Sequence, residues 1–301
     1  IDYTGTSATT IAAKIYNNLG VKPGANSITH TFAGGTTSVN GSLTLGNGTN
    51  TGVIVTASPN STTLDINGNL TIAANTTFVG NGSNTLTLAG NWTNNGSFTH
   101  NSGTVKFDGS GTSVISGATT FNNFTSDTAG KTIQFQKSSE GAPVFTFAGT
   151  LTVSGTGGVG GRVNLQSDQA GTQWLAHFNN AQSGLNYADL KDAGCSPGSA
   201  NVTLDQSTRN GGNNGSCWAF PPGLGSAPGA TGGGTGGGAP QSGGGGSGGG
   251  ATDGGSGGGT PQGGGSGGSG GGGSALGAQK QTPIRTFFRN TFWRLWSKIG
   301  R

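Results

Sequence analysis

One seven-residue pattern recurs along the first half of the chain and constrains the fold more than any other feature. It reads apolar, any residue, Gly, small polar, apolar, Thr, and then usually apolar. Its copies lie at 39–45, 66–72, 88–94, 115–121 and 147–153, of which the third ends in Asn94 and the fourth is degenerate. Positions 1, 5 and 7 point to one side of an extended strand because side chains alternate. The Gly at position 3 suits a bend or a close approach of another backbone.

Successive copies of the pattern start 22–32 residues apart, and clusters of Gly, Asn and Ser separate short runs rich in Thr, Val, Ile, Leu and Phe. Short strands repeating at this period are typical of a solenoid, in which each coil buries its apolar face against the next. We therefore predict an all-β fold, a right-handed parallel β-helix (β-solenoid), over residues 1–220. The competing fold is an antiparallel β-sandwich, which needs turn signals every 8–12 residues or so, and the sequence supplies those too.

A longer repeat overlies the short one. Residues 1–7 resemble residues 107–113, and Tyr16-Asn17-Asn18-Leu19 resembles Phe121-Asn122-Asn123-Phe124, with offsets of 106 and 105 residues. The chain has no Met and opens at a point that is mid-array in its second copy. We expect it to be a fragment of a longer exported protein with further copies upstream.

Composition divides the chain into three parts. Of the 65 Gly residues, 31 lie between positions 221 and 280, so residues 221–281 are predicted to be a disordered Gly/Ser-rich linker. Residues 1–275 carry eight Lys or Arg and ten Asp or Glu, a net charge of −2, whereas residues 276–301 carry six basic residues and no acid. Residues 1–275 offer no basic patch in sequence, so we expect no nucleic-acid partner.

The C-terminal segment 282–301 is predicted to form a basic, aromatic amphipathic helix. Thr282 suits the N-cap and Pro283 the first helical position. Such a helix is typical of binders of anionic membrane surfaces, although docking to a sorting or anchoring protein, or back onto the rest of the chain, would use the same face. The residues predicted to make this contact are Ile284, Arg285, Phe287, Phe288, Arg289, Phe292, Trp293, Arg294, Leu295, Trp296, Lys298, Ile299 and Arg301.

Cys195 and Cys217 are the two cysteines of the chain. A disulfide between them would fit an oxidising compartment and would contribute about 3 kcal/mol in the chain-entropy model, and two free thiols are the alternative. The segment 160–220, which contains them, is denser in charge and aromatics than the repeats before it. Because the end of a solenoid exposes unpaired backbone and apolar side chains, we expect this segment to cap the array.

The sequence offers little for catalysis. Tyr187, Asp189 and Lys191 share one face of a predicted strand, with Asp192 on the other. No spacing forces two carboxylates into the separation of about 5–10 Å that a glycosidase needs. Asp168, Asp205 and Arg209 could meet in space, which sequence alone does not settle. We expect a non-enzymatic protein.

Cofactor and metal sites are not expected either. His30, His100 and His177 lie far apart, without Cys or acid at ligand spacing. The Gly-rich segment 155–161 lacks the Lys-Ser/Thr of a phosphate-binding loop and its strand–helix context.

Residues 1–220 resemble the β-helical regions of bacterial surface proteins of the filamentous haemagglutinin and adhesin type. The resemblance is carried by the Asn-Gly-Ser/Asn-Leu-Thr steps at 40–44 and 67–71, the run at 90–98, and the run at 187–192 followed by Gly212-Asn213-Asn214. It implies a rigid, extracellular, non-catalytic rod on a bacterial cell surface, with a glycan or a host or neighbouring cell surface as its partner.

The alternative is a carbohydrate-active β-helix, either an enzyme of the polysaccharide lyase or hydrolase kind or a glycan-binding module. Trp92 and Trp174 would serve it if they were exposed to stack on sugar rings, but burial in the core is the expected fate of each.

Overall fold

The computed structural model of the chain describes residues 1–58, 60–82 and 84–222. The predicted linker and C-terminal helix lie outside these residues, apart from the first two linker positions. The described part contains thirty short strands and no helix. It accordingly holds no helical segment capable of crossing a membrane.

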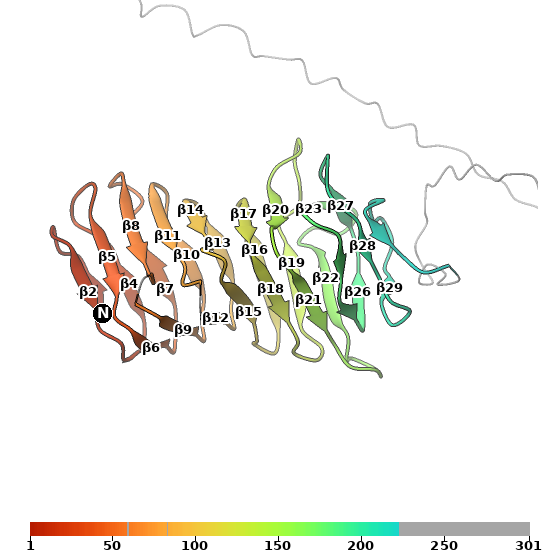
Figure 1. Cartoon of the computed structure of the whole chain (residues 1–301), viewed down its shortest axis with the longest axis horizontal. Coiled ribbons are helices and arrows are strands. Elements are labelled where there is room, and N and C mark those ends of the chain that lie inside the picture. The colour runs from red at the N-terminus through yellow and green to blue at the C-terminus, as the bar shows by residue number, and fades with distance from the viewer. Residues whose placement is uncertain (59, 83, 223–301) are drawn as a thin grey trace, which may run out of the picture. The chain divides into compact units, whose positions relative to one another are not determined.

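The strands stack as successive coils of one solenoid (Figure 1). One wall is a ten-stranded sheet, so the chain makes about nine turns. Its strands, in spatial order, are β1 (Asp2–Tyr3), β4 (Leu19–Val21), β7 (Leu43–Leu45), β10 (Leu70–Ile72), β13 (Trp92–Asn94), β16 (Thr112–Ser116), β19 (Thr132–Phe135), β22 (Val163–Ser167), β26 (Ala188–Leu190) and β29 (Arg209–Asn210).

A second wall is an eight-stranded sheet built in the same way. Its strands are β3 (Ile15–Tyr16), β6 (Gly35–Val39), β9 (Thr62–Ile66), β12 (Thr85–Leu88), β15 (Thr104–Phe107), β18 (Asn123–Ser126), β21 (Leu151–Ser154) and β25 (Leu185–Asn186).

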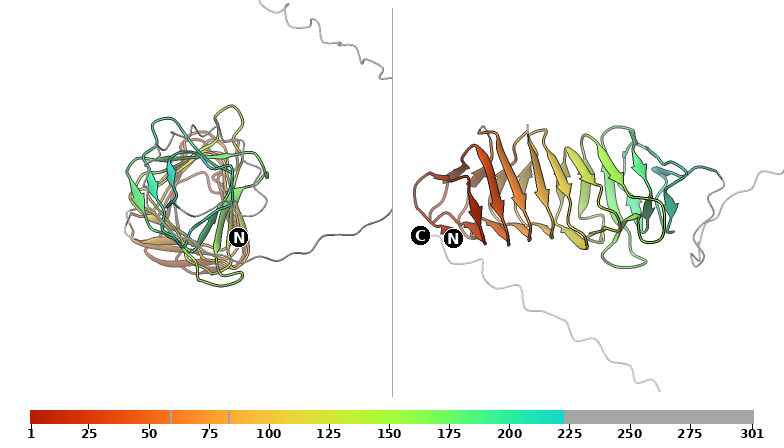
Figure 2. Two further views of the ribbon diagram at one scale, coloured as in Figure 1. Left: turned by 90° about the vertical axis from the view of Figure 1, so that its right-hand side faces the viewer. Right: turned by 90° about the horizontal axis from the view of Figure 1, so that it is seen from below.

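The third side is shared by three smaller sheets. The five-stranded sheet contains β2 (Thr9–Ile11), β5 (Thr29–Phe32), β8 (Val53–Thr56), β11 (Thr76–Val79) and β14 (Ser97–Thr99). The four-stranded sheet contains β17 (Thr119–Phe121), β20 (Val144–Phe147), β23 (Trp174–Phe178) and β27 (Ala193–Cys195). The three-stranded sheet contains β24 (Gln182–Ser183), β28 (Val202–Thr203) and β30 (Trp218–Ala219). Viewed end-on, the walls enclose the core (Figure 2).

Every pairing between these strands is parallel, which confirms the β-solenoid and excludes the antiparallel sandwich for the described residues. Register partners on neighbouring coils of the ten-stranded sheet lie 18–32 residues apart in sequence. The longest coil, from Ile133 to Leu165, contains the Gly-rich segment 155–161. The coils therefore vary in length while the register between their strands is kept.

The recurring pattern encodes a corner between two walls. In its first three copies, position 1 ends a strand of the eight-stranded sheet, and positions 5–7 form the next strand, in the ten-stranded sheet. These copies stack in register, with Ile66 beside Val39 and Leu88, and Leu70 beside Leu43 and Trp92. Positions 1, 5 and 7 are buried in all three copies. Both functions expected of the Gly, the bend and the close approach, occur at this corner.

The last two copies lie at other corners. The copy at 115–121 joins the ten-stranded to the four-stranded sheet, and the copy at 147–153 joins the four-stranded to the eight-stranded sheet. The longer repeat behaves likewise, because Tyr16-Asn17-Asn18-Leu19 and Phe121-Asn122-Asn123-Phe124 also turn between different pairs of walls. The sequence of a corner thus recurs after about 106 residues, but the two copies lie at different corners of the coil.

The core is a continuous stack of apolar side chains with an aromatic column in its second half. Trp92 and Trp174 are fully buried, as expected, and neither is available to stack on a sugar. Trp174 stacks on Phe135 with 4.0 Å between ring centroids and lies 6.0 Å from Trp218, which in turn packs edge-on against Phe178 at 5.1 Å. Aromatic pairs in such geometries add about 0.5–1.5 kcal/mol beyond their area burial.

The segment 160–220 is for the most part further coil, since β22, β26 and β29 extend the ten-stranded sheet. Only its last residues close the stack, with Trp218 placed over the aromatic column. The change in composition that suggested a cap begins about two coils before the end of the array, and it reflects a higher density of charged and aromatic residues in these coils.

Candidate functional site

An outward-facing column of polar residues runs along one wall of the solenoid. In the ten-stranded sheet, the column consists of successive register partners on neighbouring strands. In spatial order they are Thr112, Thr132, Asn164, Asp189 and Arg209. Strands in a sheet lie about 4.8 Å apart, so the column presents one side chain at each such step. The residues beside them in the strands, such as Leu165 and Leu190, are buried. Alternation along each strand therefore separates this column from the core.

The C-terminal end of the column forms the floor of a groove of about 440 Å³. Its lining residues come from the column, from the turn before β19, from the Gly-rich segment 155–161 and from the residue that precedes β22. They are Gly130, Gly158, Val159, Gly160, Arg162, Asn164, Asp189 and Arg209. The amide of Gly155 donates to Asn186 and that of Thr156 to Gly161, which holds the base of this segment. The groove is thus a product of the longest coil.

Arg162 is fixed in the groove. Its guanidinium donates to the backbone carbonyls of Ala188, at 3.4 Å, and Ser207. Its Nε lies 3.8 Å from Asp189 Oδ1, and the guanidinium lies over the Tyr187 ring, 5.7 Å from its centroid. The Arg162 side chain is 16% exposed. These contacts come from two neighbouring coils, so the guanidinium has a defined position before any ligand arrives.

Asp189 supplies an acceptor that has no donor. Its side chain is 33% exposed, and Oδ1 accepts no hydrogen bond within the described residues, since Arg162 Nε is too distant for one. Tyr187 and Lys191, the other members of the predicted outward face, are exposed, whereas Asp192 is buried. Asp192 accepts from Gly171 N at 3.0 Å and from Asn213 Nδ2 at 2.8 Å. The face predicted for this strand is therefore correct, and Asp192 is a structural group.

Arg209 lies at the end of the column and is exposed. No hydrogen bond or ion pair to another described residue engages its guanidinium. Arg162 and Arg209 are the two arginines of residues 1–222, and both line this groove, although 47 positions separate them in the sequence. With Asp189 between them, the groove carries an excess of one positive charge. Arg162 was not singled out from the sequence, because nothing local marks it.

The set Asp168, Asp205 and Arg209 does not form a joint site. Asp168 Oδ1 accepts the Lys137 amide at 2.7 Å. Asp205 Oδ1 accepts the amides of Ser207 and Thr208 in its own turn, at 3.0 and 3.1 Å. Each aspartate thus stabilises local backbone, and only Arg209 reaches the groove.

The three histidines are also separate from one another. His30 is fully buried in β5, between its register partners Thr9 and Val55, and neither ring nitrogen has a hydrogen-bond partner. Burial lowers the pKa of His30, and the backbone of Thr9 opposes that effect more weakly. His100 accepts the Ser102 amide at 2.9 Å, and His177 shares a hydrogen bond of 2.8 Å with Ser196. Among the described residues, no group of three His, Cys, Asp or Glu is arranged to hold a metal ion.

A buried lysine lies beneath the wall next to the groove. Lys131 Nζ donates to Gly109 O at 2.8 Å and to Ser113 Oγ at 3.0 Å, and the side chain is fully buried. Burial lowers the pKa of Lys131 and raises that of Asp108, and the Coulomb attraction between the two groups opposes both shifts. Both hydrogen-bond partners of the lysine are structural, so Lys131 ties neighbouring coils together and its ammonium group is not accessible to solution.

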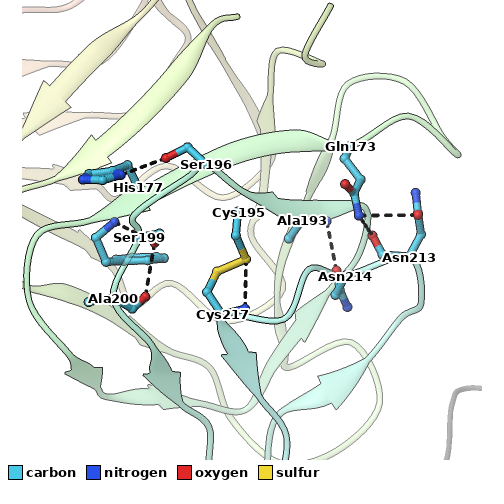
Figure 3. The surroundings of a disulfide bond; sticks show 11 residues. Gln173, His177, Ala193, Cys195, Ser196, Ser199, Ala200, Asn213, Asn214 and Cys217 are labelled. Carbon is cyan, nitrogen blue, oxygen red and sulfur yellow. Dashed lines mark hydrogen bonds between the residues drawn. A yellow bond between two sulfur atoms is a disulfide. The ribbon is translucent and has the colours of Figure 1, made fainter. Parts of the chain in front are cut away.

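Cys195 and Cys217 form a disulfide in the last coils, with 6.0 Å between their Cα atoms (Figure 3). The amide of Cys217 also donates to Cys195 Sγ. Close by, Asn214 Oδ1 accepts the Ala193 amide at 2.9 Å, and Gln173 Nε2 donates to Asn213 O at 2.7 Å (Figure 3). The disulfide and these amide contacts fasten the closing segment to the coil before it.

The residues predicted to contact a membrane or partner, from Ile284 to Arg301, lie outside the described residues. No family model matches the chain, and neither a curated protein nor a solved structure is found to be similar to it. The function therefore has to be argued from the fold and the groove.

Proposed function

We propose that the protein is a non-catalytic, adhesin-like surface protein that acts outside the cell, with the solenoid as a display rod. The observation that carries the proposal is the regular stack of parallel coils, whose outward columns present polar side chains at fixed steps while most of the buried side chains are apolar. A rod of this kind holds its lateral faces rigid, which suits contact with an extended partner. The disulfide is in keeping with an oxidising compartment, such as the exterior of a bacterium.

Adhesion of coated beads tests this proposal. Fluorescent beads carrying the full chain are passed over bacterial or host-cell layers, and retention under flow is compared with that of beads carrying the same chain reduced and unfolded in urea before coupling. We expect the folded chain to retain several times more beads. Equal retention on every layer would contradict an adhesive role for the rod.

The second part of the proposal concerns the C-terminal segment. We propose that residues 221–281 act as a flexible tether and that residues 282–301 bind an anionic membrane surface as a basic amphipathic helix. The support is the sequence alone: six basic residues and no acid in residues 276–301, with aromatic and aliphatic residues on one half of the helical wheel. Each basic residue near an anionic surface contributes about 1 kcal/mol.

Liposome flotation tests the membrane anchor. The full chain should float with vesicles containing phosphatidylglycerol, and a chain lacking residues 282–301 should not. A full chain with Arg285, Arg289 and Arg294 replaced by Gln keeps the aromatic residues and should float less. If the full and the truncated chains float equally, the segment is not a membrane anchor, and a sorting or anchoring protein becomes its expected partner.

A carbohydrate-active role is the second candidate, and one observation favours it. The groove places a carboxylate, Asp189, between two guanidinium groups on a lateral wall. The polysaccharide lyase or hydrolase version predicts new chain ends when the protein is incubated with neutral or acidic polysaccharides, and loss of that activity in Asp189→Asn. The binding version predicts affinity without cleavage.

A further inference from the structure

We propose that the groove lined by Arg162, Asn164, Asp189 and Arg209 binds a saccharide that bears a carboxylate, such as a uronate unit of an acidic polysaccharide. The inference rests on the proposed surface function and names the ligand class of one lateral site. It follows from three observations: the pairing of the two arginines, the partly exposed carboxylate of Asp189, and the shape of the groove.

The arginines point to an anion. Guanidinium groups present planar sets of donors that match a carboxylate, and they are preferred over Lys where such an anion is held in a defined orientation. Six of the eight basic residues of residues 1–222 are Lys, yet both Arg line this groove. Arg162 is held by two backbone carbonyls, while the donors of Arg209 have no acceptor among the described residues. A ligand carboxylate would supply one.

Asp189 distinguishes a saccharide from a bare anion. A carboxylate in the groove repels an inorganic anion. Asp189 Oδ1 is buried against Arg162 Nε, at 3.8 Å, whereas Oδ2 accepts no hydrogen bond within the described residues and lies on a side chain that is 33% exposed, so it can accept from a ligand hydroxyl. A uronate unit has both parts on one ring, since it carries a carboxylate for the arginines and hydroxyl groups for Asp189. Asn164, at the next step of the column, donates to Thr132 Oγ1 at 3.1 Å, and its amide oxygen accepts no hydrogen bond from another described residue.

The shape of the groove agrees with a sugar. Its volume of about 440 Å³ lies within the range of roughly 300–1,000 Å³ found for sites that bind small organic molecules. Gly130, Gly158 and Gly160 form the rim without side chains, and Val159 is the one aliphatic residue of the lining. A groove whose lining offers a single aliphatic side chain suits a hydroxylated ligand better than a peptide, which would need pockets for its side chains.

Calorimetric titration of the full chain tests the proposal. The probes are oligomers of galacturonate, of glucuronate and of mannuronate, each beside its methyl ester, which keeps the sugar and removes the charge. Heparin fragments, whose charge comes mostly from sulfate, form a further arm. We expect binding to at least one of the three uronates, at least tenfold weaker binding of its methyl ester, and weaker binding of heparin fragments than of that uronate.

Three variants separate recognition from general charge. Arg209→Gln should weaken binding of the uronate at least tenfold. Lys191→Gln removes the same charge from an exposed position on the preceding coil, outside the groove, and should change affinity less than twofold. Asp189→Ala removes the negative charge together with both acceptor oxygens. Purely electrostatic binding would therefore become stronger, whereas loss of the hydroxyl acceptor should weaken binding at least threefold. Circular dichroism confirms that each variant is folded.

Several outcomes would overturn the proposal. Among the probes, they are equal binding of acid and ester for all three uronates, no binding of any uronate, and tighter binding of heparin fragments than of every uronate. Among the variants, they are equal losses in Arg209→Gln and Lys191→Gln, and stronger binding in Asp189→Ala. None of these outcomes would affect bead adhesion by the folded chain, so failure of the ligand assignment is distinguishable from failure of the proposed surface function.

Discussion

Replacing Gly68 with Ala tests the corner at which the first three copies of the recurring pattern stack. A Cβ atom at Gly68 would lie 2.4 Å from Gly41 O and 2.5 Å from Gly41 C, both backbone atoms of the preceding coil. Ordinary contacts begin at 3.4 Å, so the two coils would have to separate by about 1 Å. The same conflict continues to the next coil, because a Cβ at Gly90 would meet Gly68 O at 2.4 Å.

The cost follows from these contacts. Forcing an extra carbon into a packed site costs about 1–3 kcal/mol, and the smaller conformational freedom of Ala in the unfolded chain returns about 0.4–1 kcal/mol. We therefore expect Gly68→Ala to lower the free energy of unfolding by about 1–2 kcal/mol. The measurement is urea unfolding followed by far-UV circular dichroism, with the midpoint and the slope compared with those of the unchanged chain.

Gly111 provides the matched control. A Cβ there would meet nothing within 4 Å, and its φ lies outside the left-handed region. Gly111→Ala should leave the free energy of unfolding unchanged or raise it by up to about 1 kcal/mol. Hydrogen exchange adds a local readout, since the Leu43 amide donates to Asn69 O across this corner at 2.8 Å and should exchange faster in Gly68→Ala only. Equal midpoints for the two variants, with no change at Leu43, would refute the close packing of these coils.

Two further predictions concern pH and redox state. Burial lowers the pKa of His30 below 6.5, so below this pH the unfolded chain binds a proton more readily than the folded chain. The free energy of unfolding should therefore be highest above pH 6.5 and fall below it by up to about 1.4 kcal/mol per pH unit. His30→Val should remove this slope in urea titrations at pH 7 and pH 5, and an identical slope in both proteins would count against the buried neutral ring. The Cys195–Cys217 disulfide links residues 22 positions apart, and its reduction should lower the stability of the last coils by about 3 kcal/mol. The readout is faster amide exchange at Ala193 and Val202. Unchanged exchange after reduction would show that the disulfide does not fasten the last coils.

Much of the architecture was predictable from sequence because the pattern indicates where the chain bends and which side chains face the core. Leu43, Leu70 and Trp92 occupy the same position of the pattern and are register partners in the structure. The pattern does not predict which corner of the coil a copy occupies, because a Gly followed by an apolar residue and Thr fits a bend between any two walls. The copies at 115–121 and 147–153 are of this kind.

The groove was predictable only in part. Alternation placed Asp189 on the outer face, but its neighbours Arg162 and Arg209 come from other coils. Coil lengths that vary from 18 to 32 residues hide which distant residues become register partners. The Gly-rich segment 155–161 carried no recognisable motif, and its role as a rim follows from the length it adds to one coil. A sequence pattern thus predicts the repeating frame, while the site arises where one coil departs from it.

The most direct test of the parallel stack is a series of distances along one outward column. Ser38, Asp65, Thr87, Lys106, Thr125 and Thr152 are successive register partners on β6, β9, β12, β15, β18 and β21. With spin labels at Ser38 and at Thr87, Thr125 or Thr152, pulsed and continuous-wave electron paramagnetic resonance should give backbone separations of about 10, 19 and 24 Å, because each strand adds about 4.8 Å. Distances that do not increase in this order would show that the coils are not stacked in parallel and would contradict the rod.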